Sequence, residues 1–393
     1  MKKTRSEKIT EYVFLIALGI YTLLVWYLIY NQLLFPTTGR FEADTPVHVK
    51  MAVEDGFVYS LTSIIYVILC KLPLANYTIS FVLALMSSLS VYYTSKLIIT
   101  AFALWDTPIK RPLVYIISFA SNFVMGFYVN IINKQHYIGY QNANMWHNST
   151  YIAMKLFAII TLINFLVLCE SYKNGMCIKA WITFTLSLAI TTCCKPSFFV
   201  VFAPVMAIML LVDWIRKTKF IRVFVFGATV FLSIIIMIWE SVVLFGSDTG
   251  NGYVIAPFAE LSRRGDHPKA TLILSVAFPL MVLAMHFKNF YKDKLYFGSI
   301  LIWLVGFCES FFLAETGSRE GDGNFLWGYS IALFIWFLAS ILKLVKDIWE
   351  KEFRHFSGFK KAYVILCLLV FGWHVISGLW YFGLLLTGVT YFV

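Results

Sequence analysis

Charged residues are scarce in this sequence. Asp, Glu, Lys and Arg make up only 13% of its 393 residues, whereas hydrophobic residues make up 60%. A soluble domain contains about a quarter charged residues, because polar side chains have to cover the surface of the folded chain. The shortage therefore excludes a soluble enzyme, a disordered chain and a nucleic-acid-binding protein, even though the net charge is +11. It predicts a polytopic membrane protein.

Cysteine is also scarce, and its spacing does not indicate a zinc site. The seven cysteines lie within or beside apolar segments and form no CxxC or Cys/His pair of the kind that binds zinc. We therefore expect them to be packing residues. A cleavable signal peptide is not expected either, because the apolar stretch 12–35 is too long and has no small-residue cleavage site.

Long apolar stretches, in contrast, fill most of the chain. A helix needs about 20 apolar residues to cross a membrane. The stretches that clearly meet this requirement are 12–34, 113–131, 151–169, 223–245, 270–287, 295–313, 326–345 and 363–385. Two others are ambiguous, since 57–103 holds one span or two, and 181–213 holds two short spans if they join near Lys195.

The distribution of Lys and Arg decides between these alternatives, because cytoplasmic loops are enriched in both. If 57–72 lies along the outer surface and only about 76–100 crosses, the basic N-terminus and the basic loops 216–222 and 343–361 all fall inside. The sequence therefore predicts an all-α, polytopic transmembrane helical bundle of about 11 spans with the N-terminus inside. We expect one integral membrane domain over 1–393, with no separate soluble domain.

The polar residues that do occur gather on one side of this predicted topology. They lie in four outer loops: 39–60, 133–150, 247–269 and 315–325. Glu240 and Glu309 lie near the outer ends of their spans, and carboxylates inside a membrane usually face a cavity or a partner. A functional site is therefore expected on the outer face.

The first outer loop carries two acidic residues and a histidine close to the membrane. Glu42 and Asp44 follow the first span, and His48 comes four positions after Asp44. Pro46 fits the first turn of a helix that begins near Thr45, so Asp44 or Thr45 could simply cap that helix. Alternatively, the carboxylate accepts a proton from a hydroxyl group of a substrate or binds a divalent cation.

The order of these features resembles the GT-C glycosyltransferases, which are multi-span enzymes that use polyprenyl-phosphate-linked sugars on the non-cytoplasmic face. The shared features are a long first outer loop (35–75) with an acidic residue, a His shortly after it, and an apolar in-plane juxtamembrane helix at 57–72. The turn Cys194-Lys195-Pro196-Ser197 is similar to the Lys-Gly-Pro turn of the aminoarabinose-transferase and protein mannosyltransferase branches. In these branches the Lys faces the lipid phosphate. Pro and Ser replace the usual Gly and Pro here, so only Lys195 carries over, and a lone Lys reaching the outer interface is the structural alternative.

The other outer loops hold further candidates for binding. Amides and aromatic rings suit a sugar ring, so the sugar or acceptor candidates are His48, Gln141, Asn142, Trp146, His147 and Asn324. Arg binds phosphate oxygens through two parallel hydrogen bonds, which makes Arg319 the first candidate for the donor phosphate, with Arg263 and Arg264 as rivals. Capping of span 151–169 by Asn148 or Ser149 is the structural alternative for the end of the second loop.

These features together predict a membrane glycosyltransferase. A lipid-phosphate sugar donor would place its phosphate near Lys195 and Arg319, while Asp44, with Glu42, would deprotonate a hydroxyl of a glycan or lipid acceptor. The resemblance implies inversion at the anomeric carbon, and a divalent cation could help to neutralise the leaving phosphate. The membrane is the expected environment, and the preference for Lys over Arg suits a bacterial plasma membrane.

Other membrane functions remain open on the sequence. A transporter or flippase of lipid-linked sugars would show paired halves with broken spans, and no such repeat is visible between the halves. A polysaccharide polymerase or ligase concentrates its outer-face Arg and His in one dominant loop, whereas four loops share them here. An acyltransferase needs a His deep in a span, and only His374 lies in such a position.

Overall fold

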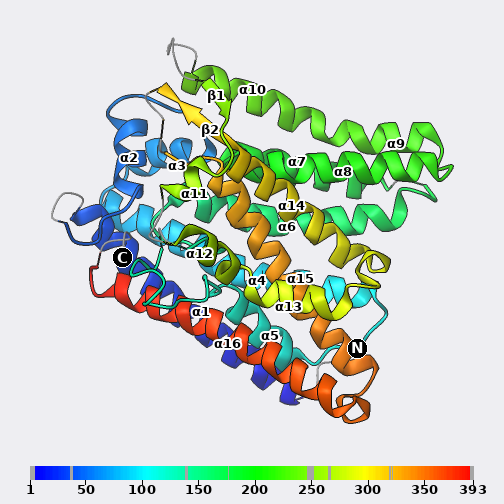
Figure 1. Cartoon of the computed structure of the whole chain (residues 1–393). Coiled ribbons are helices and arrows are strands. Elements are labelled where there is room, and N and C mark those ends of the chain that lie inside the picture. The colour runs from blue at the N-terminus through cyan, green and yellow to red at the C-terminus, as the bar shows by residue number, and fades with distance from the viewer. Residues whose placement is uncertain are drawn as a thin grey trace.

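The computed structural model describes residues 5–35, 39–137, 140–175, 177–245, 252–263, 267–317, 320 and 322–389. Most of them are helical, and the long helices pack side by side in one bundle (Figure 1). The elements are α1 (Arg5–Leu34), α2 (Thr45–Val53), α3 (Leu61–Leu69), α4 (Ala75–Leu104), α5 (Arg111–Ser121), α6 (Ser149–Ser171), α7 (Ile178–Cys194), α8 (Ser197–Ile215), α9 (Phe220–Gly227), η1 (Ala228–Val230), α10 (Phe231–Phe245), β1 (Gly252–Ile255), α11 (Ala259–Ser262), α12 (Pro268–Ser275), α13 (Ala277–His286), η2 (Phe290–Lys292), α14 (Lys294–Phe312), β2 (Leu313–Thr316), α15 (Leu326–Glu350), η4 (Phe353–His355) and α16 (Gly358–Leu386).

The helices confirm a multi-pass, all-α membrane protein, but not the predicted number of spans. Eight helical segments in the described part of the chain are long and apolar enough to cross a membrane: α1, α4, α6, α8, the α9–α10 segment, α14, α15 and α16. The pair α12 and α13 is bent by 61° and makes a ninth if it counts as one span. Helix α7 has only 17 residues. Eleven spans are therefore not shown.

The largest departure from the predicted spans lies at 113–131. Helix α5 ends at Ser121, and the chain continues without helix past Gly126. The backbone N–H groups of this stretch donate to other parts of the protein, as Met125 does to the His374 carbonyl (3.2 Å) and Phe127 to the Leu274 carbonyl (3.2 Å). Non-helical backbone is tolerated at membrane depth where protein surrounds it and satisfies its polar groups.

The first outer loop forms two short helices, α2 and α3, and the start of α2 agrees with the prediction. Helix α2 begins at Thr45, which is where the prediction placed it. The segment 57–72 contains only one short helix, α3, and its N-terminus is held by a capping box of Ser60 and Ser63. The orientation of α3 relative to a bilayer stays a prediction.

The two ends of the bundle differ in character. Helices α2 and α3 and the antiparallel β1–β2 pair lie at one end, which we call the α2 end, and the turn between α15 and α16 lies at the opposite end (Figure 1). Helix α15 runs through the middle of the bundle between them. In its most apolar stretch of 18 residues, 83% of the residues are buried inside the protein, whereas the corresponding share for α1 is 28%. It therefore connects the two ends through the core.

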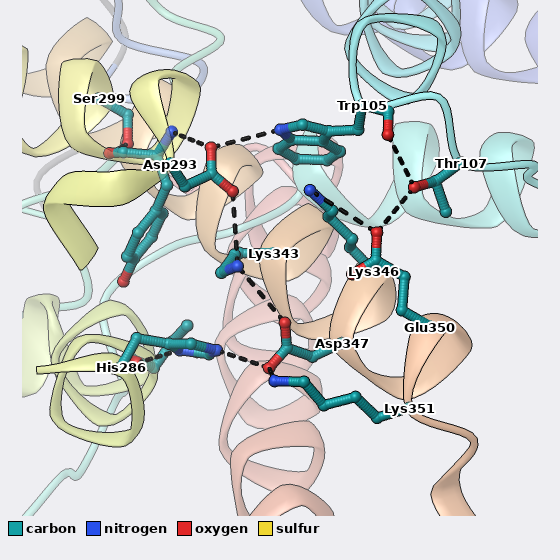
Figure 2. Close-up of polar contacts among 12 residues, drawn as sticks. Trp105, Thr107, His286, Asp293, Ser299, Lys343, Lys346, Asp347, Glu350 and Lys351 are labelled. Atoms are coloured by element: carbon teal, nitrogen blue, oxygen red, sulfur yellow. Dashed lines mark hydrogen bonds and ion pairs between the residues drawn. The ribbon is translucent and has the colours of Figure 1, made fainter. Parts of the chain in front are cut away.

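Ion pairs hold the end opposite the α2 end (Figure 2). Asp347, in the last turn of α15, accepts a hydrogen bond from Nε2 of His286 (2.9 Å) and pairs with Lys343 (3.4 Å). Lys343 also pairs with Asp293 (3.4 Å), which accepts from the indole of Trp105 (3.3 Å). This network joins α4, α13, the start of α14 and α15. Since a helix rises about 1.5 Å per residue, it lies about 30 Å along α15 from the α2 end.

Candidate functional site

Asp44 stands at the N-cap position of α2, but its side chain does not cap that helix. Its carboxylate Oδ2 instead accepts a hydrogen bond from Nδ2 of Asn148 (2.8 Å). Its backbone N–H donates to the carbonyl of His147 (3.1 Å), which also accepts from the Thr45 hydroxyl (3.2 Å). The Asp44 side chain remains 28% exposed, so it is held in place without being fully buried.

A chain of hydrogen bonds leads from this carboxylate to Lys195. The Asn148 Oδ1 accepts from the backbone N–H of Tyr151 (2.9 Å) and so caps α6, as predicted, and it also accepts from the Thr150 hydroxyl (2.7 Å). The Thr150 oxygen in turn accepts from Nζ of Lys195 (3.2 Å). Two side chains at the start of α6 therefore join a carboxylate before α2 to an ammonium between α7 and α8. We call this chain, Asp44–Asn148–Thr150–Lys195, the polar relay.

Lys195 lies against an aromatic ring rather than extending alone to the surface. Its Nζ lies 4.5 Å from the centroid of the Trp327 ring, close enough for a cation–π contact. Burial lowers the pKa of Lys195 to about 8, and the carboxylates of Asp44, Glu240 and Glu315 act in the opposite direction. Lys195 is thus mainly charged at neutral pH, with three acidic residues within electrostatic range.

Two histidines complete the surroundings of Asp44. His48 lies one turn after it on α2, and its Nδ1 shares a hydrogen bond with the Tyr59 hydroxyl (2.9 Å). Nε2 of His147 lies 3.9 Å from Oδ2 of Asp44. Burial lowers the pKa of each imidazole to about 4, and the charge of Lys195 adds to this effect. Both rings are therefore neutral at pH 7 and serve as hydrogen-bonding groups rather than charges.

Two intramembrane carboxylates, the buried Glu240 and the half-buried Glu309, lie near the same end of the bundle. Glu240 in α10 is 2% exposed, and neither of its carboxylate oxygens has a hydrogen-bond partner among the described residues. The Glu240 carboxyl lies within electrostatic range of Lys195. Glu309 in α14 lies against α15, where a Cβ added to Gly328 would meet its Oε2 at 3.0 Å. The interaction of Glu240 with Lys195 and the position of Glu309 against Gly328 agree with the prediction that both carboxylates lie in the half of the protein that holds the polar loops.

A hollow adjoins this site. Counted with the open solvent at its mouth, its empty space is about 400 Å³, of which about 50 Å³ is accessible to water. The residues that line it come from the loop before α6 and from the start of α15: Tyr137, Tyr140, Gln141, Asn142, Met145, Asp322, Gly323, Leu326, Trp327 and Ser330. The Trp327 ring therefore contacts Lys195 and also forms part of the wall of the hollow.

Several predicted ligand-binding residues have structural contacts of their own. The Asn142 amide accepts from the Gly126 N–H (2.7 Å) and donates to the Tyr137 carbonyl (3.0 Å). The Trp146 indole donates to the Tyr21 hydroxyl (2.9 Å) and is buried. These contacts explain both side chains as parts of the fold, so their sugar-binding role stays a prediction.

Two further candidates from the outer loops, Asn324 and Glu42, do not bond to the polar relay in the described part of the protein. Asn324 donates to both carboxylate oxygens of Glu315 (3.0 and 3.1 Å). Glu42 is half-buried and forms no hydrogen bond or ion pair with another described side chain. It therefore has no direct link to Asp44 within the described part of the protein.

Among the arginine candidates, Arg263 has a described position, and it does not join the polar relay. Arg263 pairs with Glu260 (3.2 Å) and with Glu320 (2.6 Å), so carboxylates occupy its guanidinium. Arg264 and Arg319 lie outside the described residues. The contribution of these two to phosphate binding stays a prediction.

The donor set does not favour a bound cation. Among the residues with described positions, no group of three or more Asp, Glu, His or Cys side chains is arranged to hold a metal ion.

Sequence reasoning did not select Thr150 or Trp327 as site residues. A sequence signal existed for both, because Thr150 ends the second polar loop and Trp327 follows directly on the fourth. Comparison with known proteins adds no family to this geometry: no protein-family model matches the chain, and no curated protein matches it significantly.

Proposed function

We propose that this protein is a membrane glycosyltransferase that moves a sugar from a polyprenyl-phosphate-linked donor to a hydroxyl of a glycan, lipid or cell-surface acceptor. The observation that supports this proposal best is the polar relay, which holds the Asp44 carboxylate and the Lys195 ammonium in one site. Transfer of a sugar from a phosphate needs both a base for the acceptor hydroxyl and a positive charge for the leaving phosphate.

The two groups take different parts in this reaction. Asp44 accepts the proton of the acceptor hydroxyl, whose oxygen attacks the anomeric carbon. The bond between that carbon and the phosphate oxygen breaks, and its electron pair stays on the phosphate. Lys195 neutralises the developing charge of this leaving group, and an in-line attack inverts the anomeric carbon. The Asn148 amide holds the base in its position.

The proposed topology places this chemistry outside the cytoplasm. It includes eleven passes with the N-terminus inside, in a plasma membrane of bacterial type. Two of these passes are short: α7, and α5 with the non-helical segment that follows it. The α2 end then lies on the outer face, where a lipid-linked donor can enter from the bilayer.

A transporter or flippase of the same lipid-linked sugars is the second candidate. The buried Glu240, which lies within electrostatic range of Lys195, favours it, because intramembrane carboxylates commonly mark transport pathways. The two functions differ in the fate of the bond between sugar and phosphate. A flippase leaves this bond intact, whereas a transferase or a polymerase breaks it.

Native mass spectrometry of the purified protein and its Asp44→Asn variant tests the proposal. We expect a polyprenyl-phosphate to copurify with the wild type and its sugar-bearing form to accumulate in the variant, since binding is kept and transfer is lost. The matched control is Asp55→Asn, an exposed carboxylate of the same loop, which should behave as the wild type. Copurification of bulk phospholipid alone in both proteins would contradict the proposal.

A further inference from the structure

We infer that the turn between α8 and α9 binds the phosphate headgroup of an anionic phospholipid. The cations that carry this inference are Arg216, Lys217, Lys219 and Arg222, which we call the basic turn. The basic turn lies at the end of the bundle opposite the α2 end, so the inference does not depend on the proposed transfer reaction.

The basic turn lies at the level of a membrane surface. Helix α8 and the α9–α10 segment are consecutive, and both are long and apolar enough to cross a membrane, so the short connection between them has to lie where the membrane ends. Helix α8 follows Lys195 directly and has 19 residues, which puts the turn about 28 Å from the polar relay. Figure 1 shows the turn at the end of the bundle away from α2 and α3.

The protein supplies no counter-charge to these four cations. Asp213 is the only acidic residue within 196–239, and its carboxylate is already bound by the Lys173 ammonium and the Tyr172 hydroxyl. Three of the four cationic side chains are exposed, and that of Arg222 is half-buried. None of the four forms an ion pair or a side-chain hydrogen bond with another residue that the structure describes. Their positive charge therefore acts on whatever lies outside the protein.

The turn between α15 and α16, at the same end of the bundle, carries cations that are neutralised instead. Lys351 pairs with Asp347 (3.3 Å), and Arg354 pairs with Glu352 (2.5 Å). Each of these two cations has a carboxylate of the protein as its partner. The basic turn, in contrast, is suited to an anion from the surroundings.

Apolar side chains flank the basic turn on both sides. Trp214 (50% exposed) and Ile215 (70%) precede it, and Phe220 (60%) and Ile221 (61%) follow it. The rings of Trp214 and Phe220 contact each other, with 5.8 Å between their centroids. Exposed apolar groups beside cations suit the boundary between acyl chains and headgroups, where Trp is enriched. Because a free phosphate would contact the cations alone, these flanks favour a lipid as the source of the phosphate.

The backbone of the turn is set by α8 itself. The Thr218 N–H donates to the Asp213 carbonyl (2.9 Å), and the Lys217 N–H donates to the Trp214 carbonyl (2.9 Å), which is the Schellman pattern that ends many helices. Lys217 has a φ of 69°, in the left-handed region that glycine adopts without strain. A cation therefore occupies the position at which glycine would suit the fold better, and the charge and the backbone can be tested separately there.

Native mass spectrometry of the full-length protein in a neutral detergent tests the inference. The probes are dioleoyl phosphatidylglycerol, dioleoyl phosphatidylcholine and inorganic phosphate. We expect phosphatidylglycerol to bind in preference to phosphatidylcholine, and inorganic phosphate to leave it bound. The double variant Arg216→Gln/Lys219→Gln should weaken phosphatidylglycerol binding at least about tenfold, because two of the cations that attract the headgroup are lost.

The matched control is Lys351→Gln/Arg354→Gln, which removes one Lys and one Arg from the neutralised turn and should bind phosphatidylglycerol as the wild type does. Lys217→Gly removes a cation and eases the positive φ, so it should weaken phosphatidylglycerol binding without lowering the thermal unfolding midpoint in detergent. Equal binding of the two lipids by the wild type, equal weakening in the two double variants, or displacement of the lipid by inorganic phosphate would overturn the inference.

Discussion

Asn148 Nδ2 lies 2.8 Å from Asp44 Oδ2, although 104 residues separate the two in sequence. The same Asn148 side chain caps α6 with its other end. The bond therefore ties the position of the carboxylate to the N-terminus of a helix in the core, while no hydrogen bond from another described residue reaches Asp44 Oδ1. A base that is held at one oxygen and open at the other is suited to accept a proton.

This double role of Asn148 can be separated by substitution. Asn148→Ser keeps a good N-cap but is too short to reach Asp44, so we expect a loss of transfer of about tenfold or more with little change in thermal stability. Asn148→Ala removes both bonds and should also lower stability by about 1 kcal/mol. Turnover and the thermal unfolding midpoint in detergent are the measurements. Wild-type turnover in the Ser variant would show that the bond does not position the base.

The charge of Lys195 predicts the alkaline side of the pH dependence. Burial lowers its pKa to about 8, and only the ammonium form can neutralise a phosphate. Transfer should therefore be full below this pH and fall as the pH rises through about 8. Lys195→Arg should move the decline to higher pH, because a guanidinium stays protonated, and Lys195→Met should be nearly inactive. An unchanged decline in the Arg variant would assign it to another group.

Lys155 is expected to stabilise the non-helical segment after α5. Its Nζ donates to Oδ1 of Asn122 (2.7 Å) and to Oδ1 of Asn144. These amides in turn donate to the carbonyls of Ser118 (2.9 Å) and Val124 (2.7 Å). Lys155→Met leaves the buried Asn144 Oδ1 without its donor, whereas Asn122 Oδ1 keeps the Ser90 hydroxyl (3.3 Å). We therefore expect a loss of about 1–3 kcal/mol.

Denaturant unfolding in detergent measures this loss. The matched control is Lys96→Met, because Lys96 lies on α4 with an exposed side chain and should change stability little. Equal stabilities of the two variants would mean that the Lys155 contacts do not hold the segment.

Gly378 permits the closest approach between α16 and the same segment. A Cβ added there would meet the Phe123 carbonyl oxygen at 1.5 Å, so that backbone has to move. Gly378→Ala should therefore destabilise the protein by at least about 1–3 kcal/mol. Gly372→Ala on the same helix has nothing within 4 Å and should be neutral or slightly stabilising. Thermal unfolding of both variants provides the comparison, and a stable Gly378 variant would show that this contact is not close.

The start of α2 was predictable because its signals are local. Pro46 fits only the first turn of a helix, and Thr45 begins it in the structure. The use of Asp44 was not predictable in the same way. An Asp before a helix is usually a cap, whereas here the carboxylate bonds to Asn148, 104 residues away in the sequence, and not to the helix.

The end of α5 shows the opposite case. The apolar run 113–131 has the length and composition of a span, so sequence reasoning extends the helix through it. The structure ends it at Ser121, because Asn122, Asn144 and carbonyls of other helices satisfy the backbone that the helix abandons. Asn122 belongs to the run, but the other partners of this backbone, Asn144 and the carbonyls of His374 and Leu274, lie outside it in the sequence.

By itself, the sequence determined that the chain is a multi-pass helical membrane protein with its polar residues concentrated in a few loops. Hydrophobicity and helix length act over neighbouring residues, so they can be read along the chain. Only the tertiary structure decided that Asp44, Asn148, Thr150 and Lys195 form one relay, and that Trp327 separates it from the hollow. These distances depend on how α2, α6, α8 and α15 pack, and packing is decided by contacts between residues that are far apart in the sequence.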